Sequence, residues 1–254
     1  MAYNQPPPDY ATSSSHDPLL GAHQHDDVPD DFKYGVNVAQ SDISIRMDFV
    51  RKVYMILTSQ LVATTAVGAT MMFSPSIQQW SQANPWMVWV SMFATFGVLF
   101  ALFWKRRSAP TNYYLLGAFT LLEAYTIGNA VSYFDSLVVL QALVITLGVF
   151  IGLTLFTFQS KYDFTGLGPY LFAGIWILII TSLVQIFLPF NRWVDLGIAI
   201  GATVLFCGYI LYDTYILIHH MSPEEYIMAA VSLYLDVINL FLSILRILND
   251  LNRD

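Results

Sequence analysis

Seven long apolar runs constrain the fold of this chain more than any other feature. They lie near residues 53–74, 86–104, 113–134, 137–159, 170–189, 195–218 and 226–249. Each has about 19–24 residues, enough at 1.5 Å per residue to cross a hydrocarbon core of roughly 30 Å. The linkers are short, and several contain helix stops such as "SPS", "ANPW", "SAPTN" and "GLGP". The sequence therefore predicts an all-α membrane protein with seven antiparallel transmembrane helices.

The composition agrees with this class and divides the chain in two. Only 11% of the residues are charged and 56% are hydrophobic, whereas soluble domains average about 25% charged residues. Residues 1–45 hold seven Asp and one Lys without hydrophobic periodicity. We therefore expect a disordered, acidic, Pro-rich cytosolic tail at 1–45 and a transmembrane domain at 46–254.

Charge and cysteine usage exclude several classes of function. Residues 46–254 hold 11 acidic and 10 basic residues, so there is no basic face for nucleic acid. The single cysteine, Cys207, lies in an apolar run and provides neither a disulfide framework nor a thiolate metal site. No cofactor is expected.

The distribution of basic residues predicts the orientation in the membrane. Seven of them stand before the first run or in the second and fourth linkers: Arg46, Arg51, Lys52, Lys105, Arg106, Arg107 and Lys161. The first and third linkers contain none. Because cytosolic linkers carry the excess of Lys and Arg, we expect a cytosolic N-terminus. Seven spans then place the C-terminus on the far side, with a re-entrant last segment as the alternative.

Three ionisable residues lie well inside the runs: Glu123, Asp213 and Asp236. Such a residue costs about 2.5–3.5 kcal/mol on insertion scales, which favours a functional role over a buried structural hydrogen bond. Asp213 and Asp236 differ in expected depth by about 7 Å, so they meet only through helix tilt or an irregular linker. If they meet, they share a proton and titrate as a unit, which would provide a pH-gated cation path. Glu123 would be a second station on that path.

The last run carries a polar stripe. Spacings of four and three residues place six side chains on one helical face: Ser232, Asp236, Asn239, Ser243, Arg246 and Asp250. A polar stripe faces other helices or a water-filled path rather than lipid. We therefore add Ser232 and Asn239 to the predicted ion path. Before this run, "HHMSPEEY" predicts a helix start with Ser222 as N-cap, Pro223 at the first position and Glu225 as capping-box partner.

Three segments carry a resemblance to a known family. They are "RRSAPTNYYLLGAFTLLEAYTIG" at 106–128, "GYILYDTYILI" at 208–218 and "YIMAAVSLYLDVINLFLSILRIL" at 226–248. The chain resembles the Bax inhibitor-1 (TMBIM) family, and its Lifeguard-like branch in particular, over roughly 46–254. The resemblance implies seven helices, with the last one central between two three-helix layers.

The resemblance also implies a function. Family members act as pH-sensitive calcium leaks of intracellular membranes and suppress cell death. Asp213 and Asp236 would form the pH sensor and gate. The same pair would contact the transported calcium and would also bind protons. Arg106 or Arg107 would latch this pair. The endoplasmic reticulum is the first expectation for localisation, with the Golgi or a vacuole as alternatives.

Three other functions compete with this interpretation. An intramembrane aspartyl protease would match Tyr212-Asp213, but the residues before Asp236 lack the glycines of its second motif, and no "PAL" follows. A heptahelical receptor or photoreceptor is the second alternative, but a retinal Schiff base needs a Lys in the last run, and none is present. A non-conducting regulator acting through contacts with cell-death proteins remains the main alternative. No enzymatic activity is expected.

The tail contains one partner motif. Pro7, Pro8 and Tyr10 belong to a PPxY sequence, "PPDY". Consecutive prolines favour the extended helix that WW-domain grooves bind. The tail therefore predicts a WW-domain protein as a partner.

Overall fold

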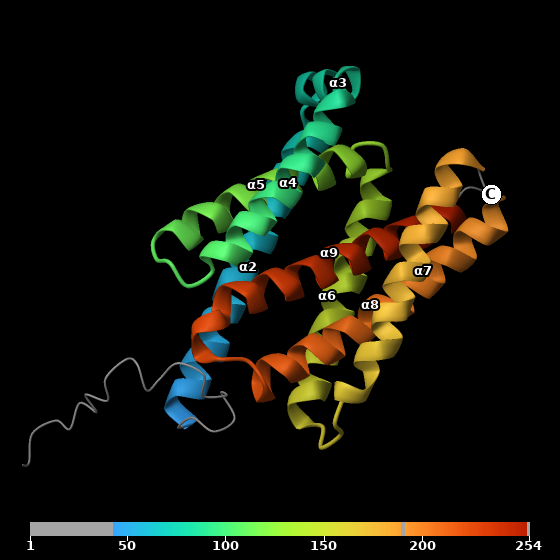
Figure 1. Ribbon diagram of the computed structural model, residues 1–254. Helices are drawn as coiled ribbons and strands as arrows, with labels where there is room; N and C mark the ends of the chain where they lie inside the picture. The colour runs from blue at the N-terminus through green and yellow to red at the C-terminus, as the bar shows by residue number, and fades with distance from the viewer. Residues whose placement is uncertain (1–42, 189–190, 253–254) are drawn as a thin grey trace, which may run out of the picture. The chain divides into compact units, whose positions relative to one another are not determined.

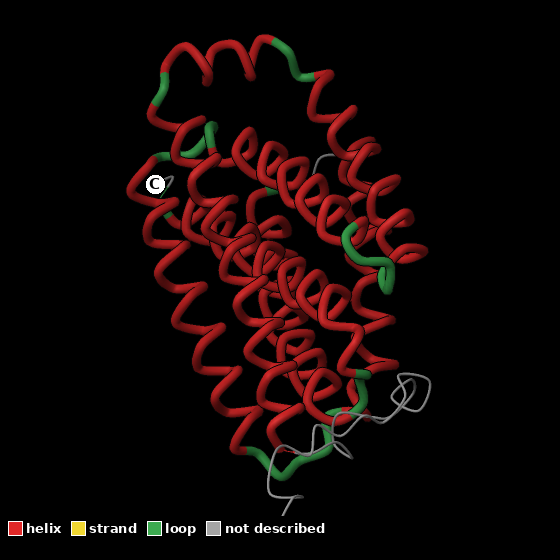
Figure 2. Tube along the Cα trace, turned by 90° about the vertical axis from the view of Figure 1, so that its left-hand side faces the viewer, coloured by secondary structure: helices red, strands yellow, loops and turns green. Residues whose placement is uncertain are grey.

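The computed structural model describes residues 43–188 and 191–252. The predicted tail at 1–45, including its PPxY motif, lies almost wholly outside these residues. Within them the chain is built from helices joined by short loops, with no strand (Figures 1 and 2). The helices are α2 Ile43–Phe73, α3 Pro75–Ala83, α4 Trp86–Lys105, α5 Thr111–Val131, α6 Ser136–Gln159, η2 Thr165–Leu167, α7 Gly168–Phe187, α8 Arg192–His219, η3 Pro223–Glu225 and α9 Tyr226–Leu251.

Each predicted apolar run corresponds to one of the long helices. Six of these helices are long and apolar enough to cross a membrane: α2, α4, α6, α7 with η2, α8, and α9 with η3. The run predicted at 113–134 forms α5, which has the length but is not among the six. Its sequence includes Asn112, Glu123 and Asn129, which lower its mean hydropathy.

The first linker differs from the prediction because it contains a helix. Ser74-Pro75-Ser76 was expected to end a helix, yet Pro75 begins the nine-residue α3. Proline ends the preceding helix but is also well suited to a first helical position, where its missing N–H costs nothing. The same sequence therefore both ends α2 and begins α3.

The predicted capping box before the last helix is wrong. Pro223 does occupy a first helical position, but it begins the short 3₁₀ helix η3 rather than α9. Ser222 makes no capping hydrogen bond through its side chain. Its hydroxyl is buried and has no partner among the described residues. Glu225 points instead towards two arginines of the α4–α5 loop.

The last helix is the most buried of the candidate spans. In α9, 72% of the most apolar window is buried, against 28% or less in the other five. It packs against α2, α6 and α8, and Figure 1 shows it running through the middle of the helical unit. Its fully buried side chains include Leu233, Tyr234, Leu240 and Leu245. A helix in this position can hold polar side chains away from lipid.

Candidate functional site

Four of the predicted site residues lie together in one open pocket between three helices. Its volume is about 300 Å³. Helices α7, α8 and α9 form it, and polar groups come from α8 and α9 only. The lining residues are Ile175, Phe206, Tyr209, Asp213, Ser232, Leu235, Asp236 and Asn239.

Asp213 and Asp236 lie next to each other in this pocket. Both side chains line it, although Asp213 comes from α8 and Asp236 from α9. Asp236 is only 6% exposed, and its Oδ2 has no hydrogen-bond partner among the described residues. The connection between α8 and α9 is irregular because it contains a bend and the 3₁₀ helix η3. An irregular linker of this kind is what the sequence required if the two aspartates were to meet.

Two further polar residues of the predicted stripe complete the pocket wall. Ser232 lies one turn before Asp236 and Asn239 lies one turn after it, so all three face the pocket from α9. The amide of Asn239 donates a hydrogen bond to the carbonyl oxygen of Leu235 at 2.8 Å. The side-chain oxygen of Asn239, Oδ1, takes no part in this bond. The pocket therefore offers two carboxyl groups, one amide oxygen and one hydroxyl.

The remaining stripe residues do not line this pocket. The hydroxyl of Ser243 is buried and donates to the carbonyl oxygen of Leu240 at 2.9 Å. Arg246 is exposed. Asp250 is buried near the end of α9, and its backbone carbonyl accepts a hydrogen bond from Arg192. The predicted stripe thus contributes three residues to the pocket, and its other three residues lie elsewhere on α9.

Glu123 lies in a different place. It is half-buried on α5 and is not part of the pocket wall. On α9, Tyr234 belongs to a second group of buried polar side chains. The Tyr234 hydroxyl is 2.8 Å from Thr64 Oγ1 of α2. Nearby, Gln60 Nε2 donates to Thr120 Oγ1 at 3.0 Å. These bonds form a second buried polar layer between α2, α5 and α9, and Glu123 lies on α5, one turn after Thr120.

The two arginines predicted as a latch contact a different carboxylate. Arg106 and Arg107 each approach Glu225 Oε1, at 3.4 and 3.5 Å. All three side chains are partly exposed, which limits what such pairs contribute. The contact joins the α4–α5 loop to the start of α9. In the part of the chain that the structure describes, neither arginine forms an ion pair with Asp213 or Asp236.

The described residues contain no cluster of three or more His, Cys, Asp or Glu side chains that could hold a metal ion. Two carboxyl groups with neutral oxygens around them form a weaker cation site than a closed cage. Conducting paths need sites of this kind, because an ion must leave as well as enter. The pocket is thus suited to transient contact with a cation.

Comparison with known sequences assigns this chain to a family. The sequence model described as "Inhibitor of apoptosis-promoting Bax1" matches residues 46–253. The chain is 47% identical over 225 residues to Bax inhibitor 1 of Schizosaccharomyces pombe, covering 89% of this chain and 85% of that protein. The chain belongs to the Bax inhibitor-1 family. The resemblance predicted from its sequence is confirmed.

Members of this family from other sources match over similar lengths. The Golgi anti-apoptotic protein of Vaccinia virus (strain Lister) is 45% identical over 226 residues, covering 89% of this chain and 95% of that protein. Protein lifeguard 4 of Mus musculus is 43% identical over 226 residues, covering 89% of this chain and 94% of that protein. The Bax inhibitor-1 family relationship therefore extends over the whole helical part of the chain.

Several residues of the pocket wall were not among the predicted site residues. Tyr209 lies one turn before Asp213, lines the pocket and donates a hydrogen bond to the Leu171 carbonyl oxygen at 3.1 Å. Its spacing from Asp213 was a usable signal. Ile175 and Phe206 gave no signal, because apolar residues that line a pocket look the same in sequence as those that face lipid.

Proposed function

We propose that this protein is a pH-sensitive calcium leak of an intracellular membrane, linked to calcium homeostasis and suppression of cell death. The observation that carries the proposal is that Asp213 and Asp236 line one pocket with Ser232 and Asn239. Asp213 and Asp236 act as the pH sensor and gate. Calcium is the transported ion, and protons compete with it at the pair.

The two carboxyl groups give the pocket its pH dependence. Like charges at close range disfavour double ionisation, so the pair holds one proton over part of the pH range. Loss of that proton adds a negative charge beside the oxygens of Ser232 and Asn239. The added charge attracts a hard cation. Because both aspartates are then ionised, they repel each other, and this repulsion loosens α8 from α9.

The latch and the second station complete the path. In the latched state, Arg106 or Arg107 leaves Glu225 and pairs with the aspartates. Movement of the α4–α5 loop would supply this exchange, since the present ion pairs are partly exposed and weak. Glu123 forms a secondary cation station beside Tyr234, on the opposite side of α9 from the pocket.

In the membrane, α5 also crosses the bilayer and so brings the number of spans to seven. Helix α9 is central between two three-helix layers. The burial of α9 supports the central position, and the contacts of α5 with α2 and α4 support a span shielded from lipid. The N-terminus is cytosolic. The membrane is that of the endoplasmic reticulum, with the Golgi as the alternative that the name of the viral relative favours. The tail binds a WW-domain protein through Pro7, Pro8 and Tyr10.

A second candidate function is a non-conducting regulator of cell death. The names Bax inhibitor 1 and Golgi anti-apoptotic protein favour it, because they describe an effect on cell death and not an ion flux. In that case the protein acts through contacts with cell-death regulators, and Asp236 stabilises the packing of α9.

Calcium flux into dye-loaded proteoliposomes distinguishes the two functions. We would compare wild type with Asp213→Asn and Asp236→Asn at about pH 6 and about pH 8, a range in which a buried carboxyl pair can titrate. Asp135→Asn is the matched control. Asp135 lies outside the pocket and caps α6 through its side-chain oxygen, and asparagine keeps that cap.

The leak is supported if wild type and Asp135→Asn show the same pH-dependent flux while both pocket variants lose or shift the pH dependence. Flux no greater than in empty liposomes, from protein shown to be folded, would reject the leak in favour of the regulator. Flux that keeps its pH dependence in both pocket variants would reject the aspartates as the gate.

A further inference from the structure

The short helix α3 connects two candidate spans without a single charged residue nearby. From Val53 to Trp104 the sequence contains no Asp, Glu, Lys or Arg. The spans α2 and α4 end and begin on either side of α3, at Phe73 and Trp86. A nine-residue helix between two spans lies close to a membrane surface, because both of its ends are tied there. Figures 1 and 2 show α3 lying across the end of the helical unit.

One face of α3 is bound to the protein. Gln78 Nε2 and Gln82 Nε2 donate to the Ser132 carbonyl oxygen, at 2.8 and 3.3 Å. Ser81 is completely buried and accepts a hydrogen bond from Asn129 Nδ2 at 2.5 Å. Asn129 and Ser132 lie at the C-terminal end of α5. Gln78, Ser81 and Gln82 of α3 thus form hydrogen bonds with the polar end of α5.

The other two faces of α3 are exposed and differ in chemistry. Ile77 and Trp80, three residues apart, are 39% and 52% exposed and share one side of the helix. Gln79 is exposed on the other side, because two residues from Ile77 correspond to about 200° around the helix. Ser76 and Ala83 are also exposed, but their spacing of four and three residues places them on the side of Trp80. The helix therefore has a protein face, a face that carries Ile77 and Trp80, and a polar face at Gln79.

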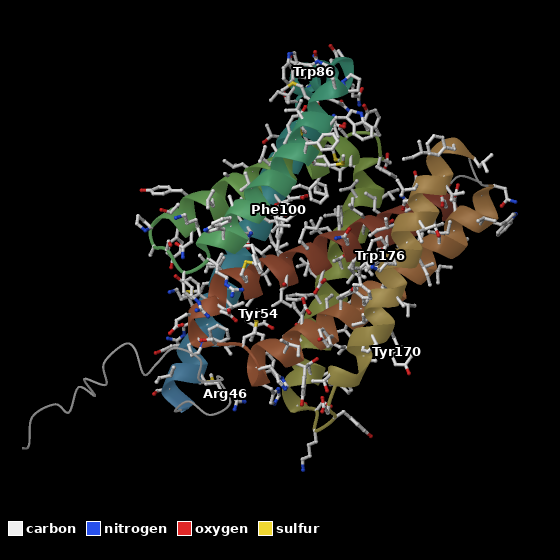
Figure 3. All side chains as sticks on the ribbon, in the orientation of Figure 1. Arg46, Tyr54, Trp86, Phe100, Tyr170 and Trp176 are labelled. Carbon is white, nitrogen blue, oxygen red and sulfur yellow. The ribbon has the colours of Figure 1, made fainter. Side chains whose placement is uncertain are left out.

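The apolar face continues onto the neighbouring spans. Phe73 at the end of α2 is 72% exposed, and Trp86 and Trp89 at the start of α4 are 59% and 58% exposed. Figure 3 labels Trp86 at the end of the unit that carries α3, and Arg46 at the opposite end. Tryptophan is enriched where a membrane meets water, since its ring is apolar and its N–H is polar. Exposed aromatic residues at the ends of both spans that flank α3 are typical of the headgroup region.

We propose that α3 is an interfacial helix whose Ile77 and Trp80 face binds the lipid surface of the membrane, on the side opposite the N-terminal end of α2. The ligand is the boundary between phospholipid headgroups and acyl chains. Interfacial helices usually add basic residues that attract anionic lipids. This one has none, so its binding does not depend on lipid charge. This inference stands independently of the proposed function.

Site-directed spin labelling tests the proposal, and the sequence suits it because Cys207 is the single cysteine. In a Cys207→Ser background, a nitroxide is attached to Ile77→Cys, Trp80→Cys or Gln79→Cys in the full chain. The chains are reconstituted in phosphatidylcholine vesicles, with and without phosphatidylserine. Collision rates with oxygen, which prefers lipid, and with a water-soluble nickel chelate then report the depth of each nitroxide. Gln79→Cys is the matched control, because it lies on the same helix but on the polar face.

The expected result is an oxygen-to-nickel collision ratio several-fold higher at 77 and 80 than at 79, in both lipid mixtures. The corresponding depth is about 5–10 Å into the headgroup boundary. Equal, water-like ratios at all three positions would overturn the proposal. So would low collision rates with both reagents at 77 and 80, which would mean that protein covers this face, or a depth that appears only with phosphatidylserine. If one labelled variant at the apolar face fails to fold, the other reports on the same face.

Discussion

At the scale of single residues, the polar side chains of α9 point to two sides of the helix. Asp236 faces α8 across the pocket, whereas Tyr234, two residues earlier, faces α2 and α5. Two residues correspond to about 200° around a helix, so the two side chains cannot share an environment. Tyr234 is completely buried, and its ring meets Phe119 edge to face, with 5.9 Å between the ring centroids. The aspartate side and the tyrosine side of α9 can therefore be perturbed separately.

The hydrogen bond between Tyr234 and Thr64 provides the first prediction at this scale. We expect Tyr234→Phe to lower the free energy of unfolding by about 0.5–1.5 kcal/mol, the usual net worth of such a bond. Thr64 keeps a bond from its hydroxyl to the Gln60 carbonyl oxygen, so it is not left unpaired. Denaturant titration of Tyr234→Phe, Thr64→Val and the double variant in detergent would measure the effect. Strictly additive losses would show that the two side chains do not interact.

Asp163, in the linker between α6 and η2, provides a prediction on pH. The side chain and the backbone N–H of Thr165 donate to Asp163 Oδ1 at 2.6 and 2.8 Å, and these bonds lower the pKa of Asp163 below its ordinary value. The resulting stabilisation is complete above the unfolded-state pKa of about 3.9 and disappears as the pH falls through the lower folded-state pKa.

We therefore expect Asp163→Ala to lower the melting temperature at neutral pH, and the difference from wild type to shrink as the pH falls below about 4. Thermal melts of both proteins across this range would measure it. Asp163→Asn is the control, because it keeps an acceptor for Thr165 without a titrating charge. A difference between wild type and Asp163→Ala that stays constant down to the lowest pH would contradict the assignment.

At the scale of elements, α7 depends on one neighbour. Only 6% of its apolar window is buried, and its packing partner among the long helices is α8. Glycines allow the two helices to approach: a Cβ at Gly208 would lie 2.8 Å from Leu171, and one at Gly174 would lie 2.5 Å from Leu205. Small residues at such crossings are a common device of membrane helices. Because α7 contributes Ile175 to the pocket, this crossing also shapes the pocket wall.

We expect Gly208→Leu to destabilise the protein by about 1–3 kcal/mol, because the added side chain overpacks the α7–α8 crossing. Gly201→Leu is the matched control on the same helix: Gly201 is exposed, and a Cβ there meets nothing within 4 Å. Its effect should stay within about 0.5 kcal/mol. Unfolding of both variants in the same detergent measures the difference, and equal effects would contradict a tight crossing at Gly208.

At the scale of the whole molecule, the role of α5 decides the topology. With seven spans, the α4–α5 loop and the α5–α6 loop lie on opposite sides of the membrane. If α5 does not cross, they lie on the same side. Ser108 and Tyr133 are exposed in these two loops and can be replaced by cysteine in a Cys207→Ser background.

We expect a membrane-impermeant thiol reagent, added to sealed vesicles, to label only one of Ser108→Cys and Tyr133→Cys. Tyr162→Cys, in the exposed linker after α6, should be labelled from the same side as Ser108→Cys, because two spans separate them. Labelling of Ser108→Cys and Tyr133→Cys from one side would show that α5 does not cross. Detergent-opened vesicles control for reactivity, since every exposed cysteine should react there.

The sequence by itself determined the helical class and the approximate positions of the long helices, although α2 begins at Ile43, ten residues before its predicted run. An apolar run of about 20 residues has few alternatives to a helix, because lipid leaves no other partner for its backbone groups. Helical spacing also placed Ser232, Asp236 and Asn239 on one face of the last helix. Family membership followed from motifs that the chain carries locally. These features are local, so they can be read along the chain.

Only the tertiary structure decided which of these groups meet. The fold places Asp213 and Asp236 in one pocket, whereas Glu123 lies outside that pocket on α5 and the arginines adjoin Glu225. Pro75 suits either the end of one helix or the start of the next, and the partners that stabilise α3, Asn129 and Ser132, lie about fifty residues away. Contacts between distant segments depend on the angle and offset at which helices cross. That geometry arises from packing many side chains at once, and no local pattern encodes it.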